Sequence, residues 1–358
     1  MTEEIAKTDP YARATDDVVV ELPRGSGRSL LSNWRVALST ANLPPGPPDA
    51  VTKWLVITRA AVQPMTITSA AIAGLLAVRK PGFDTWLFAL AAFGLILAHA
   101  SNNVLNDVFD LETGSDTKDY PRALYAPHPV LSGLVTMRRL VTAALLINLL
   151  DLAVLIVLWR DRGWLVVAFA LAGLFISVAY TAPPFRLKKR GLGEPSVLVV
   201  WGPLMVGGTY YAATGHLPWG VVVASLPYAL LATAVLMGKH IDKVVWDEPK
   251  RIRTLPVMLG ERAARRLTQA MMAGFYVLIV ALVIAGTLPW PALIALVGIT
   301  RLVPVWRIFN KPKPDAPPKE YGDYPVWPLW FAAGAFVHTR RAGALFLLGL
   351  IIGAIFDL

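Results

Sequence analysis

The sequence predicts an all-α polytopic membrane protein with nine transmembrane helices. Of its 358 residues, 55% are hydrophobic and 16% are charged, whereas about a quarter of the residues of an ordinary soluble domain are charged. Apolar runs of roughly 20 residues, enough to span a bilayer, recur from Trp54 onward. The net charge is +10, and basic residues of a membrane protein usually gather in loops on one side. We therefore expect a lipid bilayer as partner and no nucleic acid.

Residues 1–50 are expected to form a disordered or surface-associated cytosolic tail. They are rich in Pro, Gly, Ser and Thr and show little sustained periodicity, a composition that favours disorder. Within them, Leu30, Leu31, Trp34 and Leu38 fall at helical spacing, which indicates a short helix that lies on the membrane surface or has no function. Residues 51–358 are the predicted transmembrane domain.

The apolar runs define the spans in order. The last run is short, and Val326 to Val337 before it is expected to be an interfacial or re-entrant piece. The nine runs lie near residues 54–78, 84–108, 139–159, 163–181, 195–214, 218–238, 267–287, 289–306 and 342–357.

Basic residues mark one side of this bundle. The loops after the second, fourth, sixth and eighth spans hold most of the Lys and Arg between spans, whereas the opposite loops offer only Arg79, Lys80, Arg160 and Arg162. Such a bias predicts that the even-numbered loops and the N-terminus are cytoplasmic. The protein is expected in a bacterial plasma membrane.

Polar residues concentrate where the second span ends. Asn102, Asn106 and Asp110 are each four residues apart, so they share one broad helix face, with Asp107 beside them. Glu112 and Asp116 follow directly. Carboxylates at this spacing repel one another unless a cation lies between them, and Mg²⁺ binds through such carboxylates together with substrate phosphates. The alternative is a solvated acidic helix end, which is costly beside an apolar span.

A second acidic cluster ends the sixth span, and a basic loop lies between the two. The second cluster contains Asp242, Asp247 and Glu248, and both clusters fall on the same side, as in a bundle of two similar halves that serve one cavity. The loop runs from Tyr180 to Gly191 and its cations suit phosphate oxygens. Taken alone, the second cluster is equally consistent with an ordinary charged loop, and each single cation of the basic loop is better explained as an ordinary positive-inside residue. The loop cations are Arg186, Lys188, Lys189 and Arg190, and Arg253 lies near the second cluster.

Together these features fit a lipid diphosphate whose head is held by Mg²⁺ and basic residues while its tail enters the bilayer. A metal ion stabilises the departing diphosphate. The allylic carbocation left behind requires a water-poor cavity with aromatic faces. Candidates for those faces are Trp201, Tyr210, Tyr211 and Tyr228, and buried polar candidates for the cavity are Arg59 and His99.

These motifs resemble the UbiA superfamily of intramembrane prenyltransferases over roughly residues 54–357. The family's Asn-Asp-x-x-Asp motif is present as Asn106 to Asp110. The continuation through Gly114 to Asp116, the stretch from Tyr180 to Glu194, and the run Arg253 to Val257 are similar to the branch that prenylates 1,4-dihydroxy-2-naphthoate in menaquinone synthesis. The resemblance implies a nine-helix fold with a cytoplasm-facing cavity and Mg²⁺-dependent transfer from a polyprenyl diphosphate to a small lipophilic or aromatic acceptor.

The resemblance also implies roles for particular residues. Asp107, Asp110 and Asp247 would be catalytic, and the diphosphate would contact Asn106, Tyr180, Arg186, Lys188, Arg190 and Arg253. The implied metal ligands are Asn106, Asp107, Asp110, Asp116, Asp242 and Asp247. The second motif departs from the family pattern, because Asp242 and Asp247 are five residues apart instead of four, and Lys239 stands where Asn is common.

Four other hypotheses compete with this assignment. The irregular second motif is compatible with a non-aromatic acceptor (a sugar phosphate, a glycerol phosphate or haem) or with cyclisation of the prenyl chain. A transporter would place acids near mid-span, whereas these acids lie at helix ends. The fourth hypothesis is a catalytically inactive scaffold.

Overall fold

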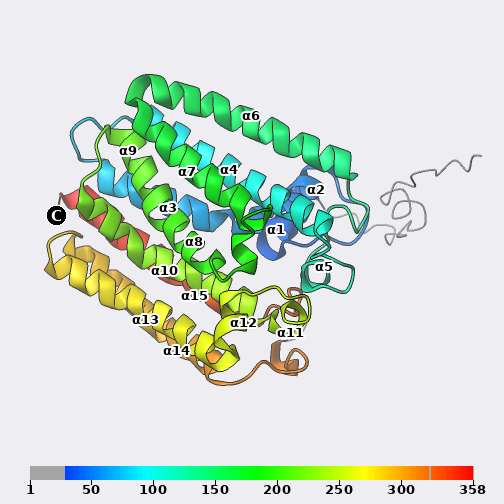
Figure 1. The fold of residues 1–358 in the computed structure, drawn as a ribbon. Coiled ribbons are helices and arrows are strands. Elements are labelled where there is room, and N and C mark those ends of the chain that lie inside the picture. The colour runs from blue at the N-terminus through cyan, green and yellow to red at the C-terminus, as the bar shows by residue number, and fades with distance from the viewer. Residues whose placement is uncertain (1–28, 322–323, 358) are drawn as a thin grey trace, which may run out of the picture.

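The structure is a computed structural model that describes residues 29–321 and 324–357. Within those residues, nine helical segments are long and apolar enough to cross a membrane, which confirms the predicted number. The segments lie alongside one another in one bundle (Figure 1). The described residues form no sheet, and a single isolated bridge pairs Arg190 with Arg253. The predicted all-α class is confirmed.

Most spans are single α-helices and three are composite. Short helices gather with the ends of α4 and α10 at one end of the bundle, called the site end below (Figure 1). The spans are η2 (Ala60–Val62) with α3 (Gln63–Ala77), α4 (Thr85–Glu112), α6 (Met137–Arg162), α7 (Trp164–Thr181), α8 (Gly193–Val199) with η4 (Val200–Gly207) and α9 (Gly208–Thr214), α10 (Trp219–Ile241), α13 (Glu261–Ile284), η5 (Trp290–Gly298) with α14 (Ile299–Asn310), and α15 (Phe331–Phe356). The short helices are α1 (Leu30–Thr40), α2 (Ala50–Ile57), α5 (Pro121–Tyr125), η3 (Leu187–Lys189), α11 (Val244–Asp247), α12 (Leu255–Leu259) and η6 (Lys319–Tyr321).

The first predicted span is two elements instead of one. Arg59 adopts a left-handed backbone conformation (φ 55°) between α2 and η2. A non-glycine residue is uncommon in that region, and here it ends α2 and starts the spanning segment at Ala60. The bend leaves the Arg59 side chain at the site end.

The ninth span also differs from its prediction. α15 starts at Phe331 and has 26 residues, so it is a full-length span. Val326 to Val337 is therefore no separate interfacial or re-entrant piece, because its second half is the first part of α15. Arg340 and Arg341 interrupt the apolar pattern, but Arg340 lies against the ring of Phe336, with its guanidinium carbon 5.8 Å from the ring centroid.

The N-terminal helix α1 confirms the short helix expected around Leu30. Ser29 caps it by accepting a hydrogen bond from the Ser32 backbone N–H. Asn42, just after α1, donates to the carbonyl oxygens of Tyr125 (3.1 Å) and Pro325 (3.0 Å). Residues 29–50, which the sequence assigned to the tail, thus pack on the bundle, whereas residues 1–28 lie outside the described residues. A membrane-surface position for α1 stays a prediction.

The tightest packing surrounds α10, which contacts α13, α15, α8 and η4. Tyr228 on α10 is buried in the same cluster as Phe275 and Phe346. Because lipid is as apolar as these side chains, close packing holds such helices together more than exclusion of water does. Gly238 permits a close approach of α10 to α15, since a Cβ there would lie 2.8 Å from the backbone nitrogen of Ala332 at the start of α15.

The fifth span changes its helical pitch midway. η4 is a π-helical stretch that contains Pro203, whose missing N–H removes one backbone hydrogen bond. The carbonyl of Trp201, within the same stretch, accepts a hydrogen bond from the Ser69 hydroxyl at 3.1 Å. Such π-helical stretches often occur at functional sites, and this one turns the indole of Trp201 toward the cavity described below.

Arg162 secures the end of the bundle opposite the site end. Its guanidinium donates to the carbonyl oxygens of Ala212 (2.8 Å), Ala213 (2.9 Å) and Gly82 (3.1 Å). We expect Arg162→Met to lower the free energy of unfolding by about 2–3 kcal/mol, since these carbonyls lose a charged donor. Thermal unfolding in detergent measures the loss. The control is Arg160→Met, since Arg160 is exposed, and equal stability of the two variants would contradict the prediction.

Candidate active site

A large cavity runs through the bundle from the site end. Its volume is about 940 Å³, and it follows α4 from Asn106 to Ala91, a length of about 22 Å at the helical rise of 1.5 Å per residue. Its deep walls are apolar side chains such as Leu155 and Leu158. At the site end it adjoins a polar pocket of about 40 Å³, and both are lined by Arg59, Asn106, Arg122, Tyr125, Tyr180 and Lys239.

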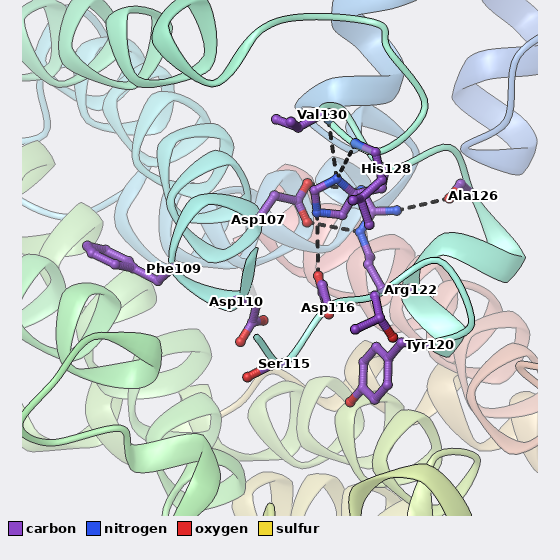
Figure 2. Close-up of polar contacts among 12 residues, drawn as sticks. Asp107, Phe109, Asp110, Ser115, Asp116, Tyr120, Arg122, Ala126, His128 and Val130 are labelled. Carbon is purple, nitrogen blue, oxygen red and sulfur yellow. Dashed lines mark hydrogen bonds and ion pairs between the residues drawn. The ribbon is translucent and has the colours of Figure 1, made fainter. Parts of the chain in front are cut away.

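Asp107, on the last turns of α4, is fully buried and holds two arginines. Its carboxylate accepts hydrogen bonds from Arg122 Nε and Nη2, both at 2.9 Å, and from Arg59 Nη2. Figure 2 shows Arg122 reaching Asp107 from the segment that follows α4, while Phe109 points away from the cluster. A buried carboxylate needs such partners, because an uncompensated charge is costly there. The guanidinium groups of Arg59 and Arg122 therefore lie between Asp107 and the polar pocket, which these two arginines line.

Asp110 and Asp116 line the polar pocket itself. Lys188 Nζ lies 2.8 and 2.6 Å from the two oxygens of Asp110. Burial and the nearby charge of Asp110 raise the pKa of the Asp116 carboxyl to about 6. Asp107, Asp116 and His128 each offer one ligand atom within 4.8 Å of the others, and these three residues lie together in Figure 2. This concentration of acids is the one that the sequence predicted at the end of the second span.

The second acidic cluster meets the first through Tyr120. The Tyr120 hydroxyl donates to Asp247 and accepts a hydrogen bond from Lys243 Nζ at 2.9 Å, and the same Nζ lies 3.8 Å from Asp247. Burial and the charge of Asp247 raise the pKa of the Tyr120 hydroxyl far above its usual value. One oxygen of Asp247, Oδ2, is buried without a hydrogen bond from any described residue. Asp247 thus lies directly behind Tyr120 and Lys243, both of which line the pocket.

Asp242 does not point into this pocket. Its carboxylate accepts hydrogen bonds from the backbone N–H groups of Phe331 (3.0 Å) and Ala332 (2.9 Å), and Lys313 Nζ lies 3.8 Å away. Burial raises the pKa of the Asp242 carboxyl to about 7, against the opposing effects of Lys313 and these N–H groups. The structure therefore places Asp242 at the N-terminus of α15, away from the other predicted metal ligands.

The predicted diphosphate-binding residues divide into two groups. Asn106, Tyr180 and Lys188 line the polar pocket, whereas Arg186, Arg190 and Arg253 are not among its lining residues. The side chains of Arg190 and Arg253 are exposed, and Arg190 Nη2 donates to the Pro184 carbonyl at 2.9 Å. The sequence could not separate these two groups, because the separation depends on the fold. The η3 turn directs Lys188 to Asp110 in the pocket and leaves Arg186 and Arg190 outside it.

Of the aromatic candidates, Trp201 lines the cavity and packs its ring edge-on against His99, with 5.3 Å between centroids. Tyr210 and Tyr228 are buried in the helical core instead, and Tyr211 donates to the carbonyl oxygen of Arg162. Only Trp201 of the four predicted residues is therefore among those that line the cavity in the described part of the chain.

Sequence comparison assigns the family. The profile of the UbiA prenyltransferase family matches residues 67–331, which is well over half of the chain. The chain belongs to the UbiA prenyltransferase family. It is 28% identical to the 2-carboxy-1,4-naphthoquinone phytyltransferase of Synechocystis over 69% of this chain and 77% of that protein. It is 30% identical to the 1,4-dihydroxy-2-naphthoate octaprenyltransferase of Escherichia coli over 62% of this chain and 73% of that protein.

Solved structures of UbiA homologues share the fold. The apo homologue from Aeropyrum pernix superimposes with a TM-score of 0.60 at 18% identity, covering 81% of this chain and 97% of that chain. The homologue from Archaeoglobus fulgidus bound to GPP and Mg²⁺ gives a TM-score of 0.51 at 14% identity, covering 83% and 99%. At these identities the likeness confirms the UbiA fold that the motifs implied.

The polar pocket of this UbiA protein contains residues that the sequence did not single out. Tyr120, Arg122 and Lys243 join the two acidic clusters. Arg59, which the sequence did offer as a buried polar candidate for the cavity, also lines the pocket although it lies outside the matched range. The sequence signal that could have pointed to these basic residues was the acidic residues themselves, since each buried carboxylate requires a nearby cation. The sequence offered many basic residues at the site end, and tertiary contacts select these. Arg122 reaches Asp107 from α5, Lys243 reaches Tyr120 from the segment after α10, and Arg59 reaches Asp107 from the bend before α3.

Proposed function

We propose that this chain transfers a polyprenyl group from a polyprenyl diphosphate to an aromatic quinone precursor similar to 1,4-dihydroxy-2-naphthoate, with Mg²⁺ as cofactor. The observation that carries the proposal is the junction of an apolar cavity of about 940 Å³ with a pocket lined by acids and bases. An apolar tail and a charged diphosphate need those two environments side by side. The names of the two naphthoquinone-pathway relatives support the class of acceptor.

The donor set fits Mg²⁺. Hard divalent cations prefer carboxylate and amide oxygens, and Asp110, Asp116 and Asn106 present such groups to the pocket. Asp107 and Asp247 lie directly behind its basic wall, and the unbonded Oδ2 of Asp247 has capacity for a further partner. We assign these five residues as the ligand set and Asp242 as a helix cap outside it. Bound Mg²⁺ would neutralise negative charge on the diphosphate and so favour its departure.

The basic residues would hold the same diphosphate. Lys188, Arg122 and Lys243 are all buried and paired with carboxylates, so the pocket has cations ready to bind phosphate oxygens when substrate arrives. Although burial lowers it, the Asp110 carboxylate raises the pKa of Lys188 above its usual value, so that Lys188 enters the reaction as a cation. Departure of the diphosphate leaves an allylic carbocation at the mouth of the cavity.

The cavity walls would then protect the carbocation. Trp201 offers an aromatic face, which stabilises a cation, and the apolar lining excludes water that would otherwise capture it. An electron-rich ring carbon of the acceptor would attack the cation, and loss of the substituent at that carbon, as a proton or as CO₂, would restore the aromatic ring and complete the transfer. We further propose that the site end faces the cytoplasm of a bacterial plasma membrane, on the basis of the basic residues in the loops at that end.

Removal of the metal tests the proposed chemistry. With protein in nanodiscs, a polyprenyl diphosphate and 1,4-dihydroxy-2-naphthoate, we expect release of diphosphate and formation of prenylated product, both reduced to background by EDTA and restored by excess Mg²⁺. The reason is that the buried acids alone repel a diphosphate. Turnover that persists in EDTA would contradict the Mg²⁺ assignment, and release without prenylated ring would redirect the proposal to another acceptor or to cyclisation.

A further inference from the structure

Lys239 differs from the other cations of the polar pocket. The pocket is lined by Arg59, Arg122, Lys188, Lys239 and Lys243. Arg59 and Arg122 pair with Asp107, Lys188 pairs with Asp110, and Lys243 lies beside Asp247. Among the described residues, the contact recorded for Lys239 is with a ring: its Nζ lies 6.0 Å from the centroid of Tyr125. Lys239 thus carries a charge that no carboxylate of the described chain neutralises.

The Lys239 ammonium group lies at the boundary between a polar and an apolar region of the site. Lys239 lies on the last turn of α10 and lines both the polar pocket and the large apolar cavity. On the pocket side its neighbours are already paired cations. On the cavity side lie apolar side chains, among them Val326, Leu329 and Phe336. An unpaired ammonium group at such a boundary is costly in the absence of a ligand, so the site is complementary to an anion attached to an apolar body.

A neighbouring donor favours the same kind of ligand. Arg59 Nε is buried and has no hydrogen-bond partner among the described residues, although Nη2 of the same side chain pairs with Asp107. Arg59 also lines both the pocket and the cavity. Two basic side chains with unused donors therefore lie at the junction, whereas Asp110 and Lys188 lie in the pocket, where the diphosphate is proposed to bind.

We propose that Lys239 binds the carboxylate of an aromatic acceptor and so selects acceptors that carry one. The inference rests on the proposed function and deepens it by naming the residue that recognises the carboxylate of the acceptor. The ring would occupy the apolar mouth of the cavity, and the carboxylate would neutralise the Lys239 ammonium group. Lys239 is in this account a positioning residue for the acceptor and has no role in holding the prenyl diphosphate.

The test compares two acceptors that differ only in the carboxylate. Turnover is measured for the unaltered protein and Lys239→Met with 1,4-dihydroxy-2-naphthoate and with 1,4-dihydroxynaphthalene. We expect Lys239→Met to raise the KM of the carboxylated ring by about 10–100-fold, the effect of losing a hydrogen bond to a charged group. The KM of the uncharged ring and the KM of the prenyl diphosphate should stay unchanged, and Lys239→Arg should restore most of the discrimination.

Controls separate this proposal from the proposed function. Lys118→Met removes an exposed lysine and should change no KM, and binding of the naphthoate followed by its fluorescence tests the site without turnover. An equal rise in KM for both rings, or a rise in the KM of the prenyl diphosphate, would overturn the carboxylate site and leave the transferase standing. Absence of turnover by the unaltered protein with both rings would overturn the proposed function and this inference with it.

Discussion

Asp110→Asn should lower the rate of prenyl transfer on the order of 10²–10³-fold, the usual cost of removing one group that stabilises developing charge. Asp110 lines the polar pocket and is the partner of Lys188. The substitution keeps the size of the side chain, removes its negative charge and weakens the proposed Mg²⁺ site. The rate is measured as diphosphate release per folded protein, with the folded fraction determined by gel filtration and thermal unfolding.

The matched control is Asp119→Asn, which removes an exposed carboxylate from the loop that follows the same helix. Its rate should equal that of the unaltered protein. Because Asp110→Asn leaves Lys188 without its partner, the double variant Asp110→Asn, Lys188→Met distinguishes loss of stability from loss of chemistry: it should recover stability and remain inactive. Full activity of a stable Asp110→Asn protein would remove this carboxylate from the reaction.

Asp247→Asn and Asp242→Asn should differ sharply, although both acids belong to the second acidic motif. Asp247 contacts Tyr120 and Lys243 behind the pocket, and we expect its loss of charge to lower the rate on the order of 10²-fold. Asp242 caps α15, and Asn can still accept one of the two N–H hydrogen bonds. We therefore expect Asp242→Asn to lower the free energy of unfolding by about 1–2 kcal/mol and to keep the rate per folded protein.

Rate measurements at saturating Mg²⁺, together with thermal unfolding curves, check both expectations on the same preparations. Mg²⁺ titration adds a second readout, since only Asp247→Asn should shift the Mg²⁺ requirement. A comparable loss of rate in the two variants, with stability unchanged, would show that Asp242 acts with the metal after all and that its contact with α15 is secondary.

The spans and the first acidic motif were accessible from the sequence because their signals are local. Hydropathy defined nine spans, and the four-residue spacing of Asn102, Asn106 and Asp110 placed them on one face of a helix that in the structure continues to Glu112. The predicted start of the ninth span was wrong because Arg340 and Arg341 interrupt the apolar run inside this helix. The hydropathy of a run cannot reveal that an arginine packs on Phe336 and faces a cavity within the bundle.

The second motif could not be resolved from spacing alone. α10 ends at Ile241 and α11 begins at Val244, so Asp242 and Asp247 lie on different elements and helical periodicity does not relate them. Asp242 turns toward α15, whose N-terminus is almost ninety residues later in the chain. That contact depends on tertiary packing, including the close approach that Gly238 permits. The position of Arg59 beside Asp107 also depends on tertiary structure, because it follows from a left-handed bend that no sequence pattern predicts.

The most direct test of the central claim is to identify the bond that the protein makes. Prenyl diphosphate labelled with ¹³C at C1 is incubated with the protein in nanodiscs, Mg²⁺ and 1,4-dihydroxy-2-naphthoate, and the product is examined by NMR and mass spectrometry. We predict that the labelled carbon is bonded to a carbon of the naphthalene ring and that inorganic diphosphate appears in equal amount. Label found only in unreacted substrate, in free prenyl alcohol or in a cyclised hydrocarbon would contradict transfer to an aromatic acceptor.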